Sequence, residues 1–207
     1  MSDPLSRRAF AVAAAGLAAG GAAAEDKPMK DPAKPAGPTE AAFERDYVAP
    51  GFKPSWKNAQ INRLLVQDFV IYAHSDLPMT KKLLEKESAL LNATMDWGAG
   101  DWETGLGGAS HMGRRDIAGF LLEKGARIDI FCAAMIGLLD AVKAFLTLEP
   151  KLIDAKGPHG FKLHFHAQVG GKEAEPVLDY LQSVKKIELK PNPFLKKPAD
   201  PGAKKPE

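Results

Sequence analysis

Three histidines, His159, His164 and His166, lie close together in the stretch KGPHGFKLHFHAQVGG. Imidazole nitrogens are common metal ligands, so this stretch is a candidate zinc or copper site. On a helix His164 and His166 would point about 200° apart, and they would share one side only in an extended segment. The stretch holds no cysteine or carboxylate to complete a tetrahedral set, and Pro-His-Gly at 158–160 is equally typical of a turn with an exposed side chain. Metal or small-ligand binding by this loop is therefore the alternative prediction.

The loop MDWGAGDWETG carries two tryptophans and three acids, a composition typical of protein-binding loops. One or both tryptophans could instead pack over the neighbouring helices, and Trp102, nearer to the next helix, is the one we expect to pack. His111 follows on that helix, where it either faces the same surface or caps the helix end. The predicted partner-binding residues come from this loop, this helix and the histidine loop: Asp96, Trp97, Asp101, Trp102, Glu103, His111 and His159.

The segment GAGDWETGLGG, from Gly98 to Gly108, is rich enough in glycine to suggest a nucleotide-binding loop. A dinucleotide loop needs a third glycine, but Glu103 or Ser110 stands at that position. A P-loop needs Lys and Ser/Thr where this chain has Leu106 and Gly107. The glycines therefore predict a loop and a tight helix start.

Few residue patterns favour catalysis. Ser110 and His111 are neighbours on a predicted helix, so their side chains diverge. The single cysteine, Cys132, lies in the apolar run IDIFCAAMIG, where a buried and inert thiol is expected. A formal net charge of +2 gives no electrostatic footprint for nucleic acid. We expect a non-catalytic protein without a cofactor.

One phrase occurs four times along the chain. ASHMGRRDIAGFLLEKGARID, from Ala109, matches AAMIGLLDAVKAFLTLEPKLID, from Ala133, and weaker copies begin at Ile71 and Ala167. The pattern predicts a short helix, a turn at Gly or Ser, and a second helix whose apolar stripe packs back on the first. Asp76 before a proline is typical of a helix N-cap, and Gly125 of a helix end. Each helix pair is too thin to bury its apolar face alone, so we expect neighbouring pairs to share a core.

The segment TGLGGASHMGRRDIAGFLLEKGA, from Thr104 to Ala126, resembles the ankyrin repeat phrase T-P-L-H-x-A-A-x-x-G-x-x-x-I-V-x-x-L-L-x-x-G-A, with Gly105 in place of the proline and Gly107 in place of the histidine. The resemblance implies an all-α, ankyrin-type solenoid of about four stacked helix-turn-helix repeats over residues 57–184. It also implies a scaffold that binds another protein through its finger loops and concave face. The short spacing between the copies at Ala109 and Ala133 leaves no room for a hairpin finger between them.

The two ends of the chain differ from this central part. Residues 1–24 hold Ser-Arg-Arg-Ala-Phe, with Arg7 and Arg8, before a weakly apolar stretch that is too short for a membrane span. This segment resembles a twin-arginine (Tat) signal, which implies export of the folded protein to a periplasm or beyond. Residues 25–56 are expected to be a Pro- and Lys-rich flexible linker, and residues 185–207 a disordered tail of similar composition.

Overall fold

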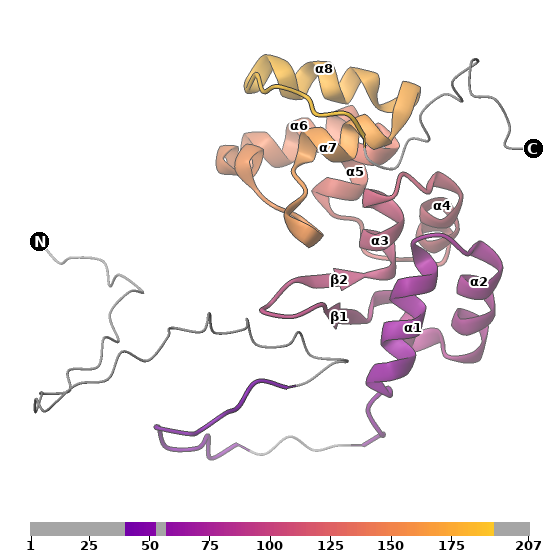
Figure 1. Cartoon of the computed structure of the whole chain (residues 1–207), viewed down its shortest axis with the longest axis vertical. Helices are drawn as coiled ribbons and strands as arrows, with labels where there is room; N and C mark the ends of the chain where they lie inside the picture. The colour runs from indigo at the N-terminus through magenta and orange to yellow at the C-terminus, as the bar shows by residue number, and fades with distance from the viewer. Residues whose placement is uncertain (1–39, 53–56, 193–207) are drawn as a thin grey trace, which may run out of the picture. The chain divides into compact units, whose positions relative to one another are not determined.

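The computed structural model of the chain describes residues 40–52 and 57–192, so the predicted signal segment with Arg7 and Arg8 lies outside the described residues. Within this part the chain is mostly helical, which confirms the all-α prediction at that level (Figure 1). The helices are α1 (Arg63–Ala73), α2 (Leu77–Lys86), α3 (Gly105–His111), α4 (Arg115–Glu123), α5 (Ile130–Ile136), α6 (Leu139–Leu148), α7 (Leu163–Val169) and α8 (Glu175–Val184). The strands are β1 (Thr94–Asp96) and β2 (Trp102–Thr104), and the 3-10 turns are η1 (Ser88–Asn92), η2 (Pro150–Asp154), η3 (Pro158–Gly160) and η4 (Gly171–Ala174).

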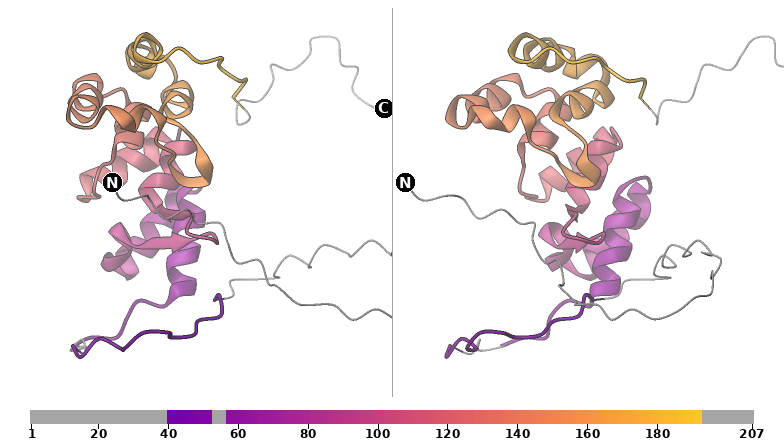
Figure 2. Two further views of the ribbon diagram at one scale, coloured as in Figure 1. Left: turned by 90° about the vertical axis from the view of Figure 1, so that its left-hand side faces the viewer. Right: turned by 60° about the vertical axis from the view of Figure 1, so that its left-hand side comes forward.

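The helices follow one another as four packed pairs, α1 with α2, α3 with α4, α5 with α6 and α7 with α8. The first helix of each pair packs on the first helix of the next, so that α1 contacts α3, α3 contacts α5 and α5 contacts α7. Figure 2 shows the same order from two further directions. Buried side chains form two clusters, one around Phe69 and Ile117 and one around Leu163 and Leu181. The apolar faces are therefore buried between pairs as well as within them.

Short polar side chains and glycines set the helix ends. Asp76 caps α2, because its Oδ1 accepts a hydrogen bond from Met79 N at 2.9 Å, as predicted. Gly125 follows α4 with φ +91°, also as predicted, and Gly137 follows α5 with φ +84°. Glycine adopts this left-handed conformation without the steric penalty of a Cβ atom.

Arg115, at the start of α4, joins three helix pairs through its guanidinium group. Its Nη1 donates to the carbonyl oxygens of Met135 at 2.7 Å and Gly170 at 3.2 Å. Its Nη2 donates to the carbonyl of Ile136 at 3.0 Å. A cation at the end of α5 satisfies carbonyl groups that the helix itself leaves unpaired.

The hairpin β1–β2, between η1 and α3, contains most of the tryptophan-bearing loop MDWGAGDWETG. The strands are antiparallel, with Met95 paired to Glu103 and Asp96 paired to Trp102. Successive side chains of a strand point to opposite faces, so Trp102 and Glu103 point to opposite sides of the hairpin. Residues 124–129, between α4 and α5, contain no strand, as expected from the short spacing between the two copies of the phrase at Ala109 and Ala133.

The described parts of the two predicted tails differ in their contacts. Residues 40–52 contain no helix or strand and are exposed. Residues 185–192 also lack helix and strand, but they lie against the last helix pair, where Gln168 Nε2 donates to the carbonyl of Lys190 at 2.9 Å. Among the described helices, none has the length and apolar character needed to cross a membrane.

Candidate metal centre

Three histidines and one glutamate meet beside the hairpin: His74, Glu103, His111 and His159. Each offers one nitrogen or oxygen ligand atom, and the four atoms all lie within 4.8 Å of one another. Glu103 is central, with Oε1 2.9 Å from His111 Nδ1 and Oε2 3.3 Å from His74 Nε2. His159 Nε2 lies 3.5 Å from the same Oε2 atom. We call these four residues the His–Glu centre.

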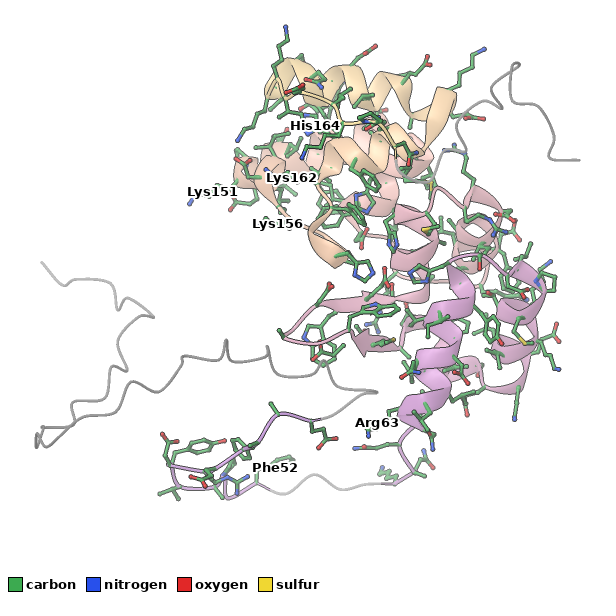
Figure 3. The ribbon with its side chains drawn as sticks, in the orientation of Figure 1. Phe52, Arg63, Lys151, Lys156, Lys162 and His164 are labelled. Atoms are coloured by element: carbon green, nitrogen blue, oxygen red, sulfur yellow. The ribbon has the colours of Figure 1, made fainter. Side chains whose placement is uncertain are left out.

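Separate segments of the chain supply the centre. His74 follows the last residue of α1, Glu103 is the middle residue of β2, and His111 ends α3. His159 comes from η3, in the connection between the last two helix pairs. Figure 3 shows this connection, with Lys156 and Lys162 labelled, reaching from α7 towards the hairpin. Packing of the pairs, and no local sequence motif, therefore brings the four side chains together.

The centre is closed on one side and partly open on the other. Glu103 and His111 are 1% and 3% exposed. The side chains of His74 and His159 are 17% and 29% exposed. The solvent-exposed side of the centre is therefore the side of these two imidazoles.

Hydrogen bonds outside the centre fix the orientation of two imidazoles. His74 Nδ1 lies 2.7 Å from the carbonyl oxygen of Val70, and His159 Nδ1 lies 2.9 Å from Asp101 Oδ2. A carbonyl and an ionised carboxylate only accept hydrogen bonds, so Nδ1 must be the donor in both rings. When the rings are neutral, both Nε2 atoms therefore carry lone pairs. In metal-binding histidines the ring nitrogen that does not bind the metal typically donates a hydrogen bond in this way.

The two lone pairs face a negative charge. His74 Nε2 and His159 Nε2 both point towards Glu103 Oε2, which already accepts a hydrogen bond from Trp97 Nε1 at 2.7 Å. Acceptors that converge in this way repel each other unless a cation lies between them or the imidazoles take up protons.

The pKa values of the centre show how protons on the imidazoles supply this positive charge. Burial acts to raise the pKa of Glu103, but hydrogen bonds from His111 and His74 outweigh burial and lower it to about 2.

His74 responds in the opposite direction. Burial acts to lower its pKa, but the hydrogen bond and negative charge of Glu103 outweigh burial, so the pKa is raised above its ordinary value. The centre thus favours positive charge next to the carboxylate.

The spacing and chemistry of the ligand atoms suit a small divalent ion. With bonds of about 2.0–2.1 Å, neighbouring ligands of a tetrahedral zinc ion lie roughly 3.3 Å apart. The separations are 2.9 Å from His111 Nδ1 to Oε1 and 3.3 and 3.5 Å from His74 Nε2 and His159 Nε2 to Oε2. Since the ligand atoms together spread over up to 4.8 Å, the side chains would close in somewhat around a bound ion. Three imidazole nitrogens and one carboxylate oxygen, without a thiolate, are ligands that suit Zn²⁺ and its neighbours such as Co²⁺ and Ni²⁺.

The glycines of α3 allow the centre to form. A Cβ atom on Gly108 would lie 2.7 Å from His74 Cε1 and 2.8 Å from His74 Nδ1. A Cβ atom on Gly105 would lie 2.8 Å from the ring of Phe69 on α1. The predicted tight helix start is confirmed, and its physical reason is the close approach of α1 and of the His74 ring to α3.

Gly108→Ala is expected to weaken metal binding by about 10- to 100-fold, as loss of ligand orientation does in other sites. The new methyl group forces the His74 ring to turn away, which breaks its hydrogen bond to Val70. Alanine is the better helix former, so the free energy of unfolding of the metal-free protein should change by less than about 1 kcal/mol. Isothermal titration with Zn²⁺ and urea unfolding measure the two effects.

Gly119→Ala on α4 is the matched control, because nothing lies within 4 Å of a Cβ atom there. It makes the same chemical change inside a helix and should leave the Zn²⁺ affinity unchanged. Equal affinities for the Gly108 and Gly119 variants would contradict the role of His74 as a ligand.

The predicted partner-binding residues separate into two groups. The first group lies in or around the centre and consists of Trp97, Asp101, Glu103, His111 and His159. Glu103 and His111 are buried, so the prediction that these two contact a partner directly was wrong. The second group, Asp96 and Trp102, lies on the exposed part of the hairpin. The expectation that Trp102 packs was wrong, since its side chain is 60% exposed, against 40% for Trp97.

The predicted histidine trio does not form a site. His164 and His166 both lie on α7, where His164 Nε2 lies 2.9 Å from the carbonyl of Lys185 and His166 Nδ1 lies 3.0 Å from the carbonyl of Lys162. His159 belongs to the His–Glu centre instead. Because residues two apart on a helix point about 200° apart, His164 and His166 cannot serve one metal site together.

His166 is expected to make the folded state sensitive to acid. Burial lowers its pKa to about 4. Its Nε2 has no hydrogen-bond partner among the described residues. Because the unfolded chain binds this proton at a higher pH than the folded chain, stability is full above about pH 6.5 and falls towards pH 4. The loss should reach about 3 kcal/mol, measured as the unfolding free energy in urea with a chelator present.

His166→Gln is the comparison for this pH dependence, since glutamine does not titrate. Between pH 7 and pH 4 the variant should lose about 3 kcal/mol less than the wild type. Parallel curves for the two proteins would assign the acid sensitivity to other groups.

The remaining sequence candidates behave as structural residues. Cys132 is buried, as predicted, and burial raises the pKa of its thiol to about 11. His74, which completes the centre, was missed by the sequence analysis.

Comparisons with known proteins found no match: no protein-family model, curated protein or solved structure matches the chain.

Proposed function

We propose that this protein binds a divalent transition-metal ion of the zinc class at His74, Glu103, His111 and His159. The observation that carries the proposal is the orientation of His74 and His159. Acceptor-only partners hold each Nδ1 as a donor, so each Nε2 atom faces the carboxylate of Glu103 and carries a lone pair whenever its ring is neutral. A metal ion replaces this repulsion by bonds to all of the facing atoms.

Four ligands from the protein are the number typical of closed, structural zinc sites, whereas catalytic sites keep a position for water. We therefore propose a non-catalytic role for the centre. The metal-binding alternative of the sequence analysis is kept, but its ligand set changes: His159 remains, and His164 and His166 are replaced.

The test is elemental analysis and titration of the full chain, produced without a histidine tag. We expect one Zn²⁺ or Co²⁺ per chain, loss of that ion in His111→Ala, and normal binding in His164→Ala. Wild-type protein that binds neither ion at neutral pH would overturn the proposal.

We also propose that the four helix pairs form an ankyrin-type solenoid. The support is the order of packing between successive first helices, together with the resemblance around Thr104–Ala126. Export through the Arg7–Arg8 signal to a periplasm, or secretion, is a further proposal from the sequence. Arg7→Lys with Arg8→Lys should leave precursor in the cytoplasm, and normal export of that variant would refute it.

Protein binding through the hairpin is the second candidate function. Trp102 is exposed beside a pocket of about 300 Å³, which the hairpin lines together with Phe131 and the segment Lys156–Pro158. Exposed tryptophans beside pockets are typical of interface hot spots.

Cross-linking in cells tests this second function. Trp102→Ala should remove a partner protein that the wild type captures. Phe52→Ala is the control, since Phe52 is an exposed aromatic residue elsewhere on the chain (Figure 3). Equal capture by all three proteins would exclude Trp102 as the contact.

A further inference from the structure

We propose that His159 is the detachable ligand of the His–Glu centre, and that residues 156–162, the clasp loop, open to let the ion enter and leave. The proposal rests on the proposed metal binding. It divides the centre into a fixed part with three ligands, His74, Glu103 and His111, and one ligand on a separate loop.

The three fixed ligands are held by the body of the fold. The His74 ring lies against the backbone of Gly108 and is bonded to the carbonyl of Val70. The carboxylate of Glu103 is buried and accepts a hydrogen bond from Trp97. His111 is buried at the end of α3. A partial site with its ligands already oriented can capture an ion before the last ligand arrives.

The clasp loop is closed by a bridge of its own and also packs on the body of the fold, since a Cβ atom on Gly157 would lie 3.2 Å from the Phe131 ring and one on Gly107 3.5 Å from Pro158 Cγ. Lys156 and Lys162 pair as an antiparallel bridge, and Gly157 N donates to the carbonyl of Phe161 at 2.8 Å. Within this bridge the turn η3 carries His159 at φ +56°, a left-handed conformation that is unfavourable for a residue with a side chain. Opening can therefore keep this bridge and break the contacts of the loop with Phe131, Gly107 and the hairpin.

Asp101 connects the clasp loop to the hairpin. Its Oδ1 accepts a hydrogen bond from His159 N, and its Oδ2 accepts one from His159 Nδ1, both at 2.9 Å. The two side chains are 32% and 29% exposed, so water competes for these bonds. Asp101 therefore positions His159 without contacting the ion.

Opening the clasp loop leaves one coordination position vacant on an ion held by three ligands. A monodentate nitrogen donor, such as imidazole or the histidine side chain of an acceptor protein, fits that position by the same chemistry as His159. The ion is then exchangeable through this side of the centre.

Asp101→Asn in the full chain tests the positioning role. Asparagine has one acceptor oxygen for two donors, so it cannot hold both His159 N and the Nδ1–H tautomer. We expect Co²⁺ to dissociate into excess chelator about 10- to 100-fold faster than from the wild type. Asp96→Asn, in the same hairpin but with its Oδ1 bonded to the turn at Gly98 N and Gly100 N, should match the wild-type rate.

His159→Ala tests the vacant position directly. This variant should bind Co²⁺ more weakly than the wild type, and millimolar imidazole should change its visible spectrum while leaving the wild-type spectrum unchanged. Complete loss of Co²⁺, as in His111→Ala, or a spectrum that ignores imidazole, would overturn the proposal. So would an unchanged dissociation rate in Asp101→Asn. If the wild type itself binds no Co²⁺, the proposed function fails with it, so the two failures are distinguishable.

Discussion

Glu103→Gln is expected to remove the metal binding that we propose for the wild type. The substitution removes the negative charge that holds the ion, and the new amide nitrogen can donate a hydrogen bond to one of the imidazole nitrogens that face it. The centre then satisfies its own polar atoms without a cation. We expect the Zn²⁺ affinity to fall by more than about 100-fold, because loss of a residue that only orients a ligand already lowers metal affinity by up to about that factor.

Thermal unfolding separates this effect from damage to the fold. At a Zn²⁺ concentration of about 100 times Kd, binding should raise the midpoint of the wild type by roughly 10 °C, because the ion stabilises only the folded state. Glu103→Gln should show no such rise, while its metal-free circular dichroism stays close to that of the wild type.

Glu123→Gln is the control, since Glu123 is an exposed residue of α4 that loses the same charge away from the centre. It should bind Zn²⁺ as the wild type does. A Glu103→Gln protein that keeps wild-type affinity would remove Glu103 from the ligand set.

Gly137→Ala is expected to lower the free energy of unfolding by about 3 kcal/mol. Gly137 has φ +84°, which is unfavourable for alanine, and a Cβ atom there would lie 2.2 Å from the carbonyl oxygen of Glu173. That neighbour is backbone, so α5 and η4 must move apart. Urea unfolding with a fixed chelator concentration measures the change.

Gly125→Ala separates the two causes. Gly125 also follows a helix, at φ +91°, but nothing lies within 4 Å of a Cβ atom there. Only the conformational penalty remains, so the expected loss is about 1 kcal/mol. Equal losses at both positions would show that the contact with Glu173 relaxes freely.

Local features of the fold could be predicted because neighbouring residues determine them. The cap at Asp76, the end at Gly125 and the helices around the repeated phrase follow from short-range geometry. The buried state of Cys132 follows from its apolar surroundings. These predictions needed no knowledge of which helices pack together.

The site could be predicted only in part. The sequence assigns Glu103 and His111 to protein binding, and His159 to protein binding or, in the alternative, to a metal site, because it shows types of residue but not which side of a strand is buried. His74 had no motif around it. The signal that could have found it is positional: His74 and His111 both end the first helix of a pair, and successive first helices lie side by side.

Asp101 and His159 lie 58 residues apart in the chain, whereas the strongest contacts between helices join helix pairs that follow one another. An array with purely local contacts can unfold from one end while the other end stays folded. An ion bound between His159 and the first two pairs links distant parts of the array, so that opening one part also costs the metal bonds. We therefore expect the unfolding transition of the loaded chain to be steeper, and so more cooperative, than that of the metal-free chain.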